Sequence, residues 1–367
     1  MKRLLCIVAS LDQGGAETFL MKLYRRLDTA AYQMDFIVCA DGAYDEEVLS
    51  RGGRIVKIPL RTHSPGKAMQ AITKAVREGR YAYVIKLCDS PVGVLDLIAA
   101  KRGGAEWIGA RSCNSFSSES ALRHFAGEIL RPVLNRVCDY RLAPSDLAAK
   151  YTFGEKAYQN GEVCILKNAL DLDTYRFDPT ARTAIRAELG ISDKTPVIGH
   201  IGRFSAQKNH SFLLDVFASI KARQPEAVLL LVGKGELETE IRDRAAALRL
   251  SDSVIFTGVR SDVPALLSAM DVFVFPSLYE GMPNTVIEAQ ATGLPCVIAD
   301  TVTREADITG LVQYLPLENP ERWAAEALSS IPEDRADTHG SFIGQGYEIE
   351  SVVGQFIKLV FKEQDYA

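Results

Sequence analysis

The sequence lacks the features that mark membrane-spanning, zinc-binding and disulfide-stabilised proteins. No apolar run approaches the roughly 20 residues needed to cross a bilayer. The seven cysteines are odd in number, scattered and free of C-x-x-C spacing. This usage predicts a reduced, cytoplasmic protein without a thiolate zinc site. The five histidines contain no i,i+4 pair, so we expect each to be structural or exposed.

A basic excess and low-complexity tracts are also missing. The net charge of −5 and the isoelectric point near 5.7 argue against a nucleic-acid partner. Any anionic ligand must therefore be held by local groups. Lys2 and Arg3 before an apolar stretch imitate a short signal peptide, but Asp12 follows without a small-residue cleavage site, so we expect a first buried strand.

Strand and helix patterns alternate along all 367 residues, which predicts an α/β protein of two doubly wound, Rossmann-like parallel-sheet domains. The junction falls at Asn168, and Ala169 would strain the hinge if that position needed positive φ. Apolar residues at helical spacing predict a terminal helix over 349–360. Strands are expected over residues 4–9, 34–39, 55–58, 83–87, 107–110, 140–143, 163–166, 197–201, 228–232, 254–257, 272–275, 296–299 and 311–315.

Two glutamates, Glu280 and Glu288, flank the start of a predicted helix in the stretch 271–300. This stretch forms one unit, which consists of an apolar strand, a loop with Gly281 and Pro283, a helix from about Thr285 and a second strand. Helix N-termini favour phosphate, and carboxylates accept hydrogen bonds from sugar hydroxyls, so this unit suits a nucleotide-sugar. A capping box starting at Thr285 would explain Glu288 equally well.

Other glycine-rich and basic loops follow predicted strands. Gly14 and Gly15 would let backbone approach a diphosphate, and the absence of G-x-G-x-x-G spacing argues against a dehydrogenase. Arg203 offers a forked donor and Lys208 a point charge, which together suit two phosphates. Gly202 lies in the same loop as Arg203 and is a further candidate for donor binding. Two more loops, over residues 233–236 and 257–260 and including Val259, leave strands at the same predicted sheet edge. Their glycines could let backbone groups reach a base or ribose, or they could form ordinary strand-to-helix turns.

Asp171 and Asp173 form a D-x-D pattern, a spacing of two carboxylates that binds a metal in some enzymes. The pair lies in the predicted interdomain hinge, and no histidine nearby in sequence completes a ligand set. We therefore expect no metal site there.

The E-x7-E segment resembles the signature of the retaining group 1, or family 4, glycosyltransferases, and G-G-A-E after the first strand is similar to another mark of that family. The resemblance covers nearly the full length, and G-G-A-E-T-F and Y-D-E-E-V-L make it closest to bacterial exopolysaccharide or capsular polysaccharide glycosyltransferases. It implies the GT-B fold, with two domains facing a cleft. The terminal helix would cross back, giving a first domain of residues 1–168 with 347–367 and a second of residues 169–346.

The resemblance also implies the roles of individual residues. Glu280 would lie by the transferred sugar and Glu288 would bind the nucleotide ribose, while Arg203 and Lys208 would stabilise the departing diphosphate. The sugar- and phosphate-facing backbone would come from Gly281, Met282, Pro283, Asn284 and Thr285.

The sequence departs from the family on the acceptor side. Polysaccharide-type members carry a histidine-containing loop of the type H-S-H-N where this chain has Arg111, Ser112, Cys113 and Asn114. A second histidine pair is replaced at Lys86. Arginine cannot act as a proton shuttle at neutral pH, so we expect Arg111 and Asn114 to bind the acceptor, with Arg111 gripping an anionic group.

The implied activity is retaining transfer of a hexosyl unit from a UDP-sugar to a saccharide acceptor, such as a lipid-linked oligosaccharide, without metal or cofactor. Peripheral contact with the inner face of the cell membrane would accompany it. Two alternatives stay open: a UDP-sugar epimerase of the same fold, and a catalytically weak sugar-nucleotide-binding partner, which the missing histidines favour.

Overall fold

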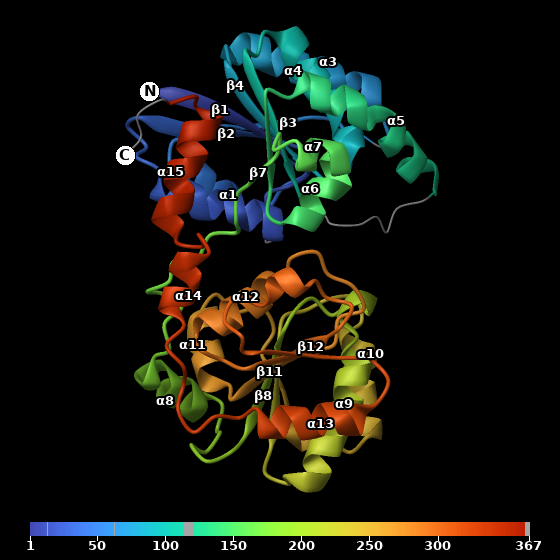
Figure 1. Cartoon of the computed structure of the whole chain (residues 1–367), viewed down its shortest axis with the longest axis vertical. Coiled ribbons are helices and arrows are strands. Elements are labelled where there is room, and N and C mark those ends of the chain that lie inside the picture. Colours follow the sequence, from blue (N-terminus) through green and yellow to red (C-terminus); the bar gives the residue numbers. More distant parts are fainter. Residues whose placement is uncertain (13, 62, 114–120, 364–367) are drawn as a thin grey trace. The chain divides into compact units, whose positions relative to one another are not determined.

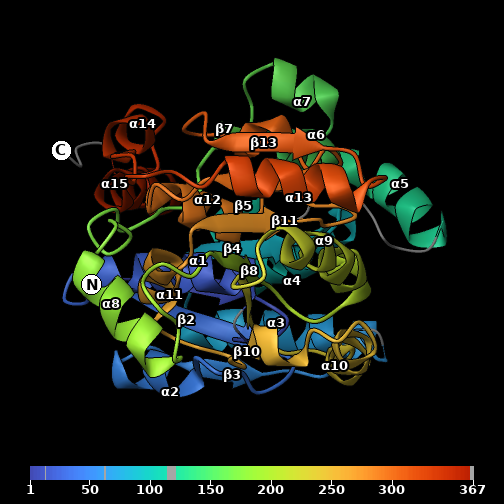
Figure 2. The same cartoon turned by 90° about the horizontal axis from the view of Figure 1, so that it is seen from below.

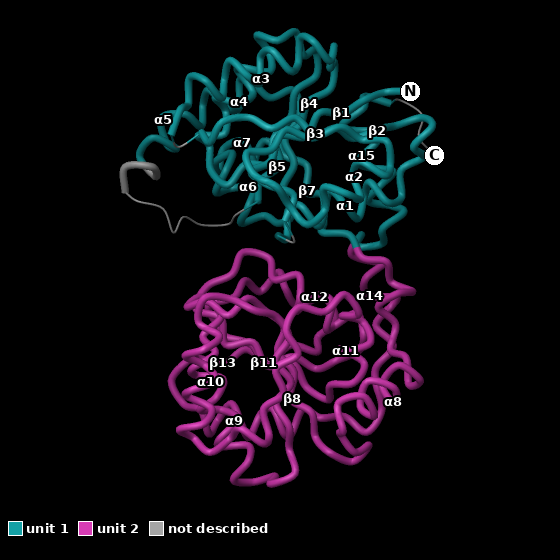
Figure 3. The backbone as a smooth tube through the Cα atoms, turned by 180° about the vertical axis from the view of Figure 1, so that it is seen from behind, with its two compact units in different colours: residues 1–169, 346–367 teal, residues 170–345 magenta. Residues whose placement is uncertain are grey.

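The computed structural model describes residues 1–12, 14–61, 63–113 and 121–363, with only the backbone of residues 121–124. The chain forms two compact units (Figure 3). Unit 1 comprises Met1–Ala169 and Gly346–Ala367, and unit 2 comprises Leu170–Gln345. These boundaries fall one residue from those expected at 168/169 and 346/347. Each unit is a doubly wound α/β domain, as the GT-B expectation requires.

Unit 1 is built on a seven-stranded parallel sheet in the order β3-β2-β1-β4-β5-β6-β7. Most of its strand residues are buried, as expected of strands covered by helices on each side, although β2, β4 and β5 also bury the charged residues Asp35, Lys86 and Arg111. All seven residues of β2 are buried, for example. The strands are β1 (Lys2–Ile7), β2 (Tyr32–Val38), β3 (Ile55–Lys57), β4 (Tyr83–Cys88), β5 (Trp107–Ser112), β6 (Tyr140–Ala143) and β7 (Cys164–Ile165).

Helices cover both faces of this sheet (Figure 1). The helices α3 and α4 pack against one another, and α1 packs against the terminal helix α15. The helices of unit 1 are α1 (Gly15–Arg26), α2 (Asp45–Ser50), α3 (Pro65–Gly79), η1 (Pro91–Gly93), α4 (Val94–Gly103), α5 (Ala121–Val137), α6 (Asp146–Phe153), α7 (Glu155–Gln159) and α15 (Ile349–Val360).

The terminal helix α15 belongs to the core of unit 1, which confirms the predicted return of the chain. Its residues Val352, Phe356 and Val360 are buried in the same cluster as β1 and β2. The indole of Trp107 donates a hydrogen bond to the carbonyl of Leu359 at 2.9 Å. The helix therefore closes a layer that the first 169 residues leave incomplete.

Unit 2 repeats the plan with a six-stranded parallel sheet in the order β10-β9-β8-β11-β12-β13. Its strands are β8 (Val197–Ile201), β9 (Val228–Val232), β10 (Val254–Phe256), β11 (Val272–Phe275), β12 (Cys296–Ala299) and β13 (Val312–Leu315). Helices α9 and α13 pack against one another, as do α8 and α11 (Figure 2). The helices are α8 (Pro179–Glu188), η2 (Ala206–Lys208), α9 (His210–Arg223), α10 (Glu238–Ala247), η3 (Ser251–Ser253), α11 (Val263–Ala269), α12 (Asn284–Ala291), η4 (Arg304–Ala306), α13 (Pro320–Ser329) and α14 (His339–Gly344).

Both sheets reverse their strand order at one point, between β1 and β4 in unit 1 and between β8 and β11 in unit 2. Loops leaving the carboxyl ends of these strand pairs diverge, and open α/β sheets bind ligands in the crevice that results. Ala169 is buried and does not have positive φ, so the expected strain at the hinge is absent.

Candidate functional site

The loops after β8 and β11 meet around the carboxylate of Glu280. Its Oε1 accepts hydrogen bonds from Lys208 Nζ at 2.6 Å, Ser277 Oγ at 2.8 Å and Gln207 Nε2 at 3.1 Å. The side chains of Lys208 and Glu280 are 17% and 10% exposed. Within the described part of the chain, no hydrogen bond is made to Oε2, which leaves one oxygen of a nearly buried carboxylate for a ligand.

Local sequence explains why the two loops meet. Pro276 ends β11, and the hydroxyl of Thr301 donates to the carbonyl of Ser277 at 2.9 Å. On the other side, Asn209 adopts the left-handed conformation with φ of 53°, which asparagine tolerates better than most residues. That turn ends η2 at Lys208 and starts α9, so the ammonium group faces the β11 loop.

Helix α12 begins beside this cluster, directly after Pro283. Pro283 supplies no side-chain cap, and the first turn of α12 holds no acidic residue. The positive end of the helix dipole at the N-terminus of α12 is therefore not neutralised by a side chain of that turn. Thr285 lies inside the helix, not at its N-cap, so the capping-box interpretation of Glu288 is wrong. Glu288 is buried in the second turn.

Three glycine loops adjoin the end of β8. The N–H of Gly202 donates to Val232 and that of Gly233 to Gly258, at 3.0 and 2.8 Å. A Cβ on Gly233 would lie 2.2 Å from the Gly202 carbonyl oxygen, and its φ of +131° also requires glycine. The loops therefore pack backbone to backbone, with Val259 exposed at the rim.

Arg203 lies in the same β8 loop but does not join the Glu280 cluster. Its side chain is 74% exposed and pairs with Glu236 at 3.1 Å. The structure thus brings Lys208, Glu280 and the start of α12 together. Gly281 and Met282 lie between Glu280 and the helix, and Asn284 and Thr285 are its first two residues. Arg203 stays at the surface of the loop after β8.

Two buried histidines under the site were not singled out by the sequence. The rings of His200 and His210 lie edge to face at 4.7 Å, and His200 Nδ1 lies 2.9 Å from the Val274 carbonyl. Burial, with Lys208 as a smaller cause, lowers the pKa of His210 to about 4, and burial followed by His210 lowers that of His200 well below its usual value. Both are neutral at pH 7. Their spacing of ten positions gives no periodic signal.

Gly14 and Gly15 lie in unit 1, at the start of α1, whereas the other candidate donor-binding residues lie in unit 2. A Cβ on Gly14 would meet the carboxylate of Glu17 at 2.4 Å. Glu17 therefore folds back over the first turn of α1, and burial raises its pKa. A carboxylate at this helix start competes with a phosphate for the same N–H groups.

Arg111 is enclosed by unit 1 rather than facing solvent. It is 1% exposed, lies 3.7 Å from the centroid of the Phe19 ring and donates to Asn168 Oδ1. Burial lowers its pKa to about 10. These contacts join β5, α1 and the end of unit 1, so the structure gives Arg111 a scaffold role. The other expected acceptor residue, Asn114, lies outside the described residues.

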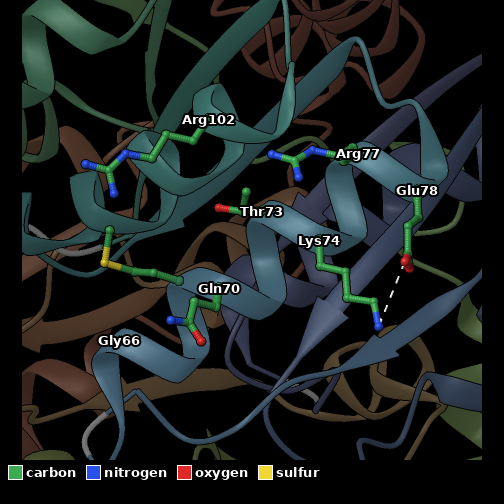
Figure 4. Close-up of a pocket in the computed structure, with 8 residues that line it drawn as sticks. Gly66, Gln70, Thr73, Lys74, Arg77, Glu78 and Arg102 are labelled. Atoms are coloured by element: carbon green, nitrogen blue, oxygen red, sulfur yellow. Dashed lines mark ion pairs between the residues drawn. The ribbon is translucent and has the colours of Figure 1, made fainter.

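A groove of about 610 Å³ runs along α3 in unit 1 (Figure 4). Arg77 and Arg102 line it, while Lys74 pairs with Glu78 at 3.8 Å. None of the sequence-predicted site residues lies in this groove. It is an open, basic surface feature of α3 and α4.

The residues that the structure describes contain no group of three or more His, Cys, Asp and Glu side chains that could hold a metal ion. Asp171 Oδ1 instead accepts the N–H of Thr174 at 3.3 Å. No described helix combines the length and hydrophobicity that crossing a bilayer requires.

This arrangement defines a class of protein. Two doubly wound sheets, with a lysine–glutamate pair beside a helix N-terminus at the switch point of the second, define a two-domain α/β protein with a candidate site for an anionic ligand at the carboxyl ends of its strands. The family model of the group 1 glycosyl transferases matches residues 181–322, which include Lys208, Glu280 and Glu288. EpsF of Bacillus subtilis, named as a glycosyltransferase, is 32% identical over 100% of this chain and 98% of its own. The chain belongs to the group 1 glycosyltransferase family.

Further similarities are more distant. An Escherichia coli galactosyltransferase, named as acting from UDP-galactose on α-D-GlcNAc-diphosphoundecaprenol, is 28% identical over 64% of this chain and 62% of its own. HepE of Anabaena, solved with UDP-glucose, superposes with a TM-score of 0.80 at 19% identity and covers 99% of this chain and 100% of its own. The latter likeness confirms the GT-B fold.

Proposed function

We propose that this glycosyltransferase moves a hexosyl unit from a UDP-sugar to a saccharide acceptor with retention of the anomeric configuration. The observation that carries the proposal is the Lys208–Glu280 pair at 2.6 Å beside the uncapped start of α12. A cation, a carboxylate oxygen without a hydrogen bond and a helix N-terminus together match the diphosphate and the sugar hydroxyls of one donor.

Each group has a distinct role in this proposal. Oε2 of Glu280 accepts hydrogen bonds from the sugar, while Glu288 accepts them from the ribose. Lys208, Arg203 and the backbone of residues 281–285 stabilise the diphosphate as it departs. Gly202 belongs to the same loop as Lys208, and the loop of Val259 approaches the base or ribose. No residue is placed as a covalent nucleophile, so catalysis rests on positioning and on stabilising the leaving group. Neither metal nor cofactor takes part.

The acceptor side of the proposal rests on the relatives. The Escherichia coli enzyme is named for a diphosphoundecaprenol-linked sugar, and another relative, the Salmonella typhi protein VipC/TviE, for Vi polysaccharide biosynthesis. By analogy, the acceptor here is a lipid-linked oligosaccharide of exopolysaccharide or capsule biosynthesis. The enzyme then works in the cytoplasm at the inner face of the membrane.

Helix α5 offers a surface for that contact. Phe125, Ile129 and Val133 are 64%, 58% and 38% exposed, and their spacing of four places them in one stripe. Arg136 adds a cation to the last turn. An apolar stripe with basic residues suits a peripheral helix that lies in the headgroup layer.

Incubation with a panel of UDP-sugars, with and without a lipid-linked saccharide, tests the proposal. We expect UDP release with one or few sugars, stimulated by acceptor and unaffected by EDTA, and strongly reduced by Lys208→Ala or Arg203→Ala. Activity lost in EDTA and restored by magnesium would contradict metal independence. An epimer formed without UDP release would identify an epimerase, and tight binding without turnover would identify a binding partner.

A further inference from the structure

Residues 332–345 form the last part of unit 2, before the chain re-enters unit 1 at Gly346. This return segment, which includes α14, is hydrogen-bonded to the C-terminal end of α12 (Figure 1). The N-terminal end of the same helix belongs to the proposed donor site. The return segment therefore holds the end of α12 that lies opposite the site.

Thr338 supplies a hydroxyl donor to the C-terminus of α12. Its Oγ1 lies 2.9 Å from the carbonyl oxygen of Gln290 and 3.2 Å from that of Ala291. These are the last two residues of the helix, where carbonyls have no partner within the helix itself. Thr338 is only 5% exposed, so its hydroxyl supplies the hydrogen bond that water gives at an exposed helix end.

Arg335 makes a second contact with this end of the helix. Its Nη1 donates to the carbonyl of Thr292, the C-cap of α12, at 3.2 Å. Its Nη2 donates to the carbonyls of Leu267 and Met270, at the end of α11. The guanidinium also lies 5.1 Å from the centroid of the Phe177 ring. A cation at a helix C-terminus is favourable, and this one joins α12 to α11 and to the segment before α8.

The backbone of the return segment packs directly against the residue after the C-cap. Gly293 has a φ of +67°, in the left-handed region, and a Cβ on it would lie 2.2 Å from the carbonyl oxygen of Ala336. Glycine is therefore required at this position for both its conformation and its close contact.

Helix α12 is short enough for its two ends to move together. It has eight residues, which is about 12 Å at the usual rise of an α-helix, and its hydrogen bonds connect one turn to the next. A shift of its C-terminus is therefore passed on to the N–H groups at its start and to Glu288. Groups that bind a ligand must be held within about 0.5 Å of the productive geometry.

We propose that Thr338 and Arg335 are positioning residues for the nucleotide-sugar site, because they hold the C-terminus of α12 and thereby place its N-terminus and Glu288. The inference rests on the proposed glycosyltransferase function and adds two residues that act on the donor only through the helix. Under the alternative, these contacts stabilise unit 2 and have no influence on the donor.

Titration calorimetry with UDP on the full chain separates the two cases. Thr338→Val keeps the shape of the side chain and removes the hydroxyl, so UDP affinity should fall about fivefold, the equivalent of one neutral hydrogen bond. Thr338→Ser keeps a hydroxyl and should restore the affinity. The matched control is Ser268→Ala, which removes a buried hydroxyl of α11 that donates to the Pro264 carbonyl at 3.0 Å. It should lower the melting temperature and leave UDP affinity unchanged.

Arg335 has a matched control of its own in the same unit. Arg182 donates to the carbonyls of residues 268–270 and to Asp271 at 2.7 Å, which all lie outside α12. Arg335→Gln should weaken UDP binding about fivefold as well, whereas Arg182→Gln should affect only the melting temperature. Each titration is made below the melting temperature of the variant, so that folded chains are compared.

A double-mutant cycle shows whether Thr338 acts through α12. Glu288→Ala removes a donor contact of the same helix, so the combined loss of UDP affinity in Thr338→Val with Glu288→Ala should be smaller than the product of the two single losses. Single losses that multiply in full would overturn the inference. Wild-type affinity in Thr338→Val, or an equal loss in Ser268→Ala, would overturn it too and leave the proposed function standing. Absence of UDP binding by the wild-type chain would overturn the proposed function itself, and this inference with it.

Discussion

At the scale of single residues, substitution of Glu280 should reduce transfer without changing UDP affinity. Its Oε1 is held by Lys208, Gln207 and Ser277, while Oε2 carries no hydrogen bond within the described residues. Glu280→Gln keeps the shape but removes the charge and one acceptor. Transfer should fall at least about a hundredfold, the loss typical of a catalytic polar group, while UDP affinity, measured by calorimetry, stays near wild type. Wild-type turnover in this variant would refute the assignment.

Glu288 should act on the nucleotide instead. Because it lies in the second turn of α12 and not in a capping box, its removal should cost little helix stability. Glu288→Ala should weaken UDP binding by roughly 1–3 kcal/mol, the cost of a lost charged hydrogen-bond partner. A drop in melting temperature with unchanged UDP affinity would show that Glu288 is structural.

His210 predicts a pH dependence of stability. A histidine in the unfolded chain titrates near pH 6.5, whereas burial and Lys208 lower the pKa of His210 in the fold to about 4. Between these values the unfolded chain binds more protons, so the free energy of unfolding falls as pH drops from 6.5 towards 4. From pH 7.5 to 5.5 this one group removes about 1.4 kcal/mol.

The variant His210→Phe keeps a ring against Phe204, which lies at 4.4 Å, and cannot be protonated. Its loss of stability between pH 7.5 and 5.5, measured by urea unfolding, should be about 1.4 kcal/mol smaller than that of the wild type. Equal losses would show that His210 can be protonated in the folded chain.

The sequence identified only part of the chemistry at this scale. Lys208 and Glu280 lie 72 positions apart, and only their places after two parallel strands indicated that they meet. The enclosure of Arg111 by Phe19 and Asn168 has no local signal, because it depends on how α1 packs on β5. The pairing of Arg61 with Asp96 has no local signal either, since the two residues lie on different elements.

At the scale of elements, the predictions were strongest where residues are buried on both faces. The strands β6, β8, β9, β11 and β12 have the predicted bounds, because an unbroken apolar run between turn residues has few alternative structures. Short polar helices were harder to predict. Helix α8 and helix α14 were not among the predicted elements, because capping by Asp178 and packing of Phe342 decide the structure there.

Helix α5 carries a prediction of its own. If its stripe enters a membrane, Phe125→Ser with Ile129→Ser should weaken co-sedimentation with phosphatidylglycerol vesicles at least about tenfold, because two large side chains lose their burial. The matched control is Leu248→Ser with Ile343→Ser, which removes two exposed apolar side chains of unit 2. Equal losses in the two double variants would exclude α5 as the contact.

At the scale of the whole molecule, the GT-B architecture could be predicted because the strand–helix alternation repeats twice and the terminal helix has a clear apolar face. Each unit encloses its own core, and each places candidate ligand groups at the switch point of its sheet. The proposed donor groups around Glu280 belong to unit 2, and a cavity of about 490 Å³ lies at the switch point of unit 1. Sequence alone suggested the first and could not locate the second.

The most direct test of the central claim is a time course by ¹³C NMR with UDP-[¹³C]hexose and a lipid-linked saccharide. We predict that the α-linked hexose of the donor appears on the acceptor with α configuration, in an amount equal to the UDP released. A β-linked product would contradict retention, and conversion of the donor to an epimer, or its persistence unchanged in the presence of a binding acceptor, would contradict glycosyl transfer.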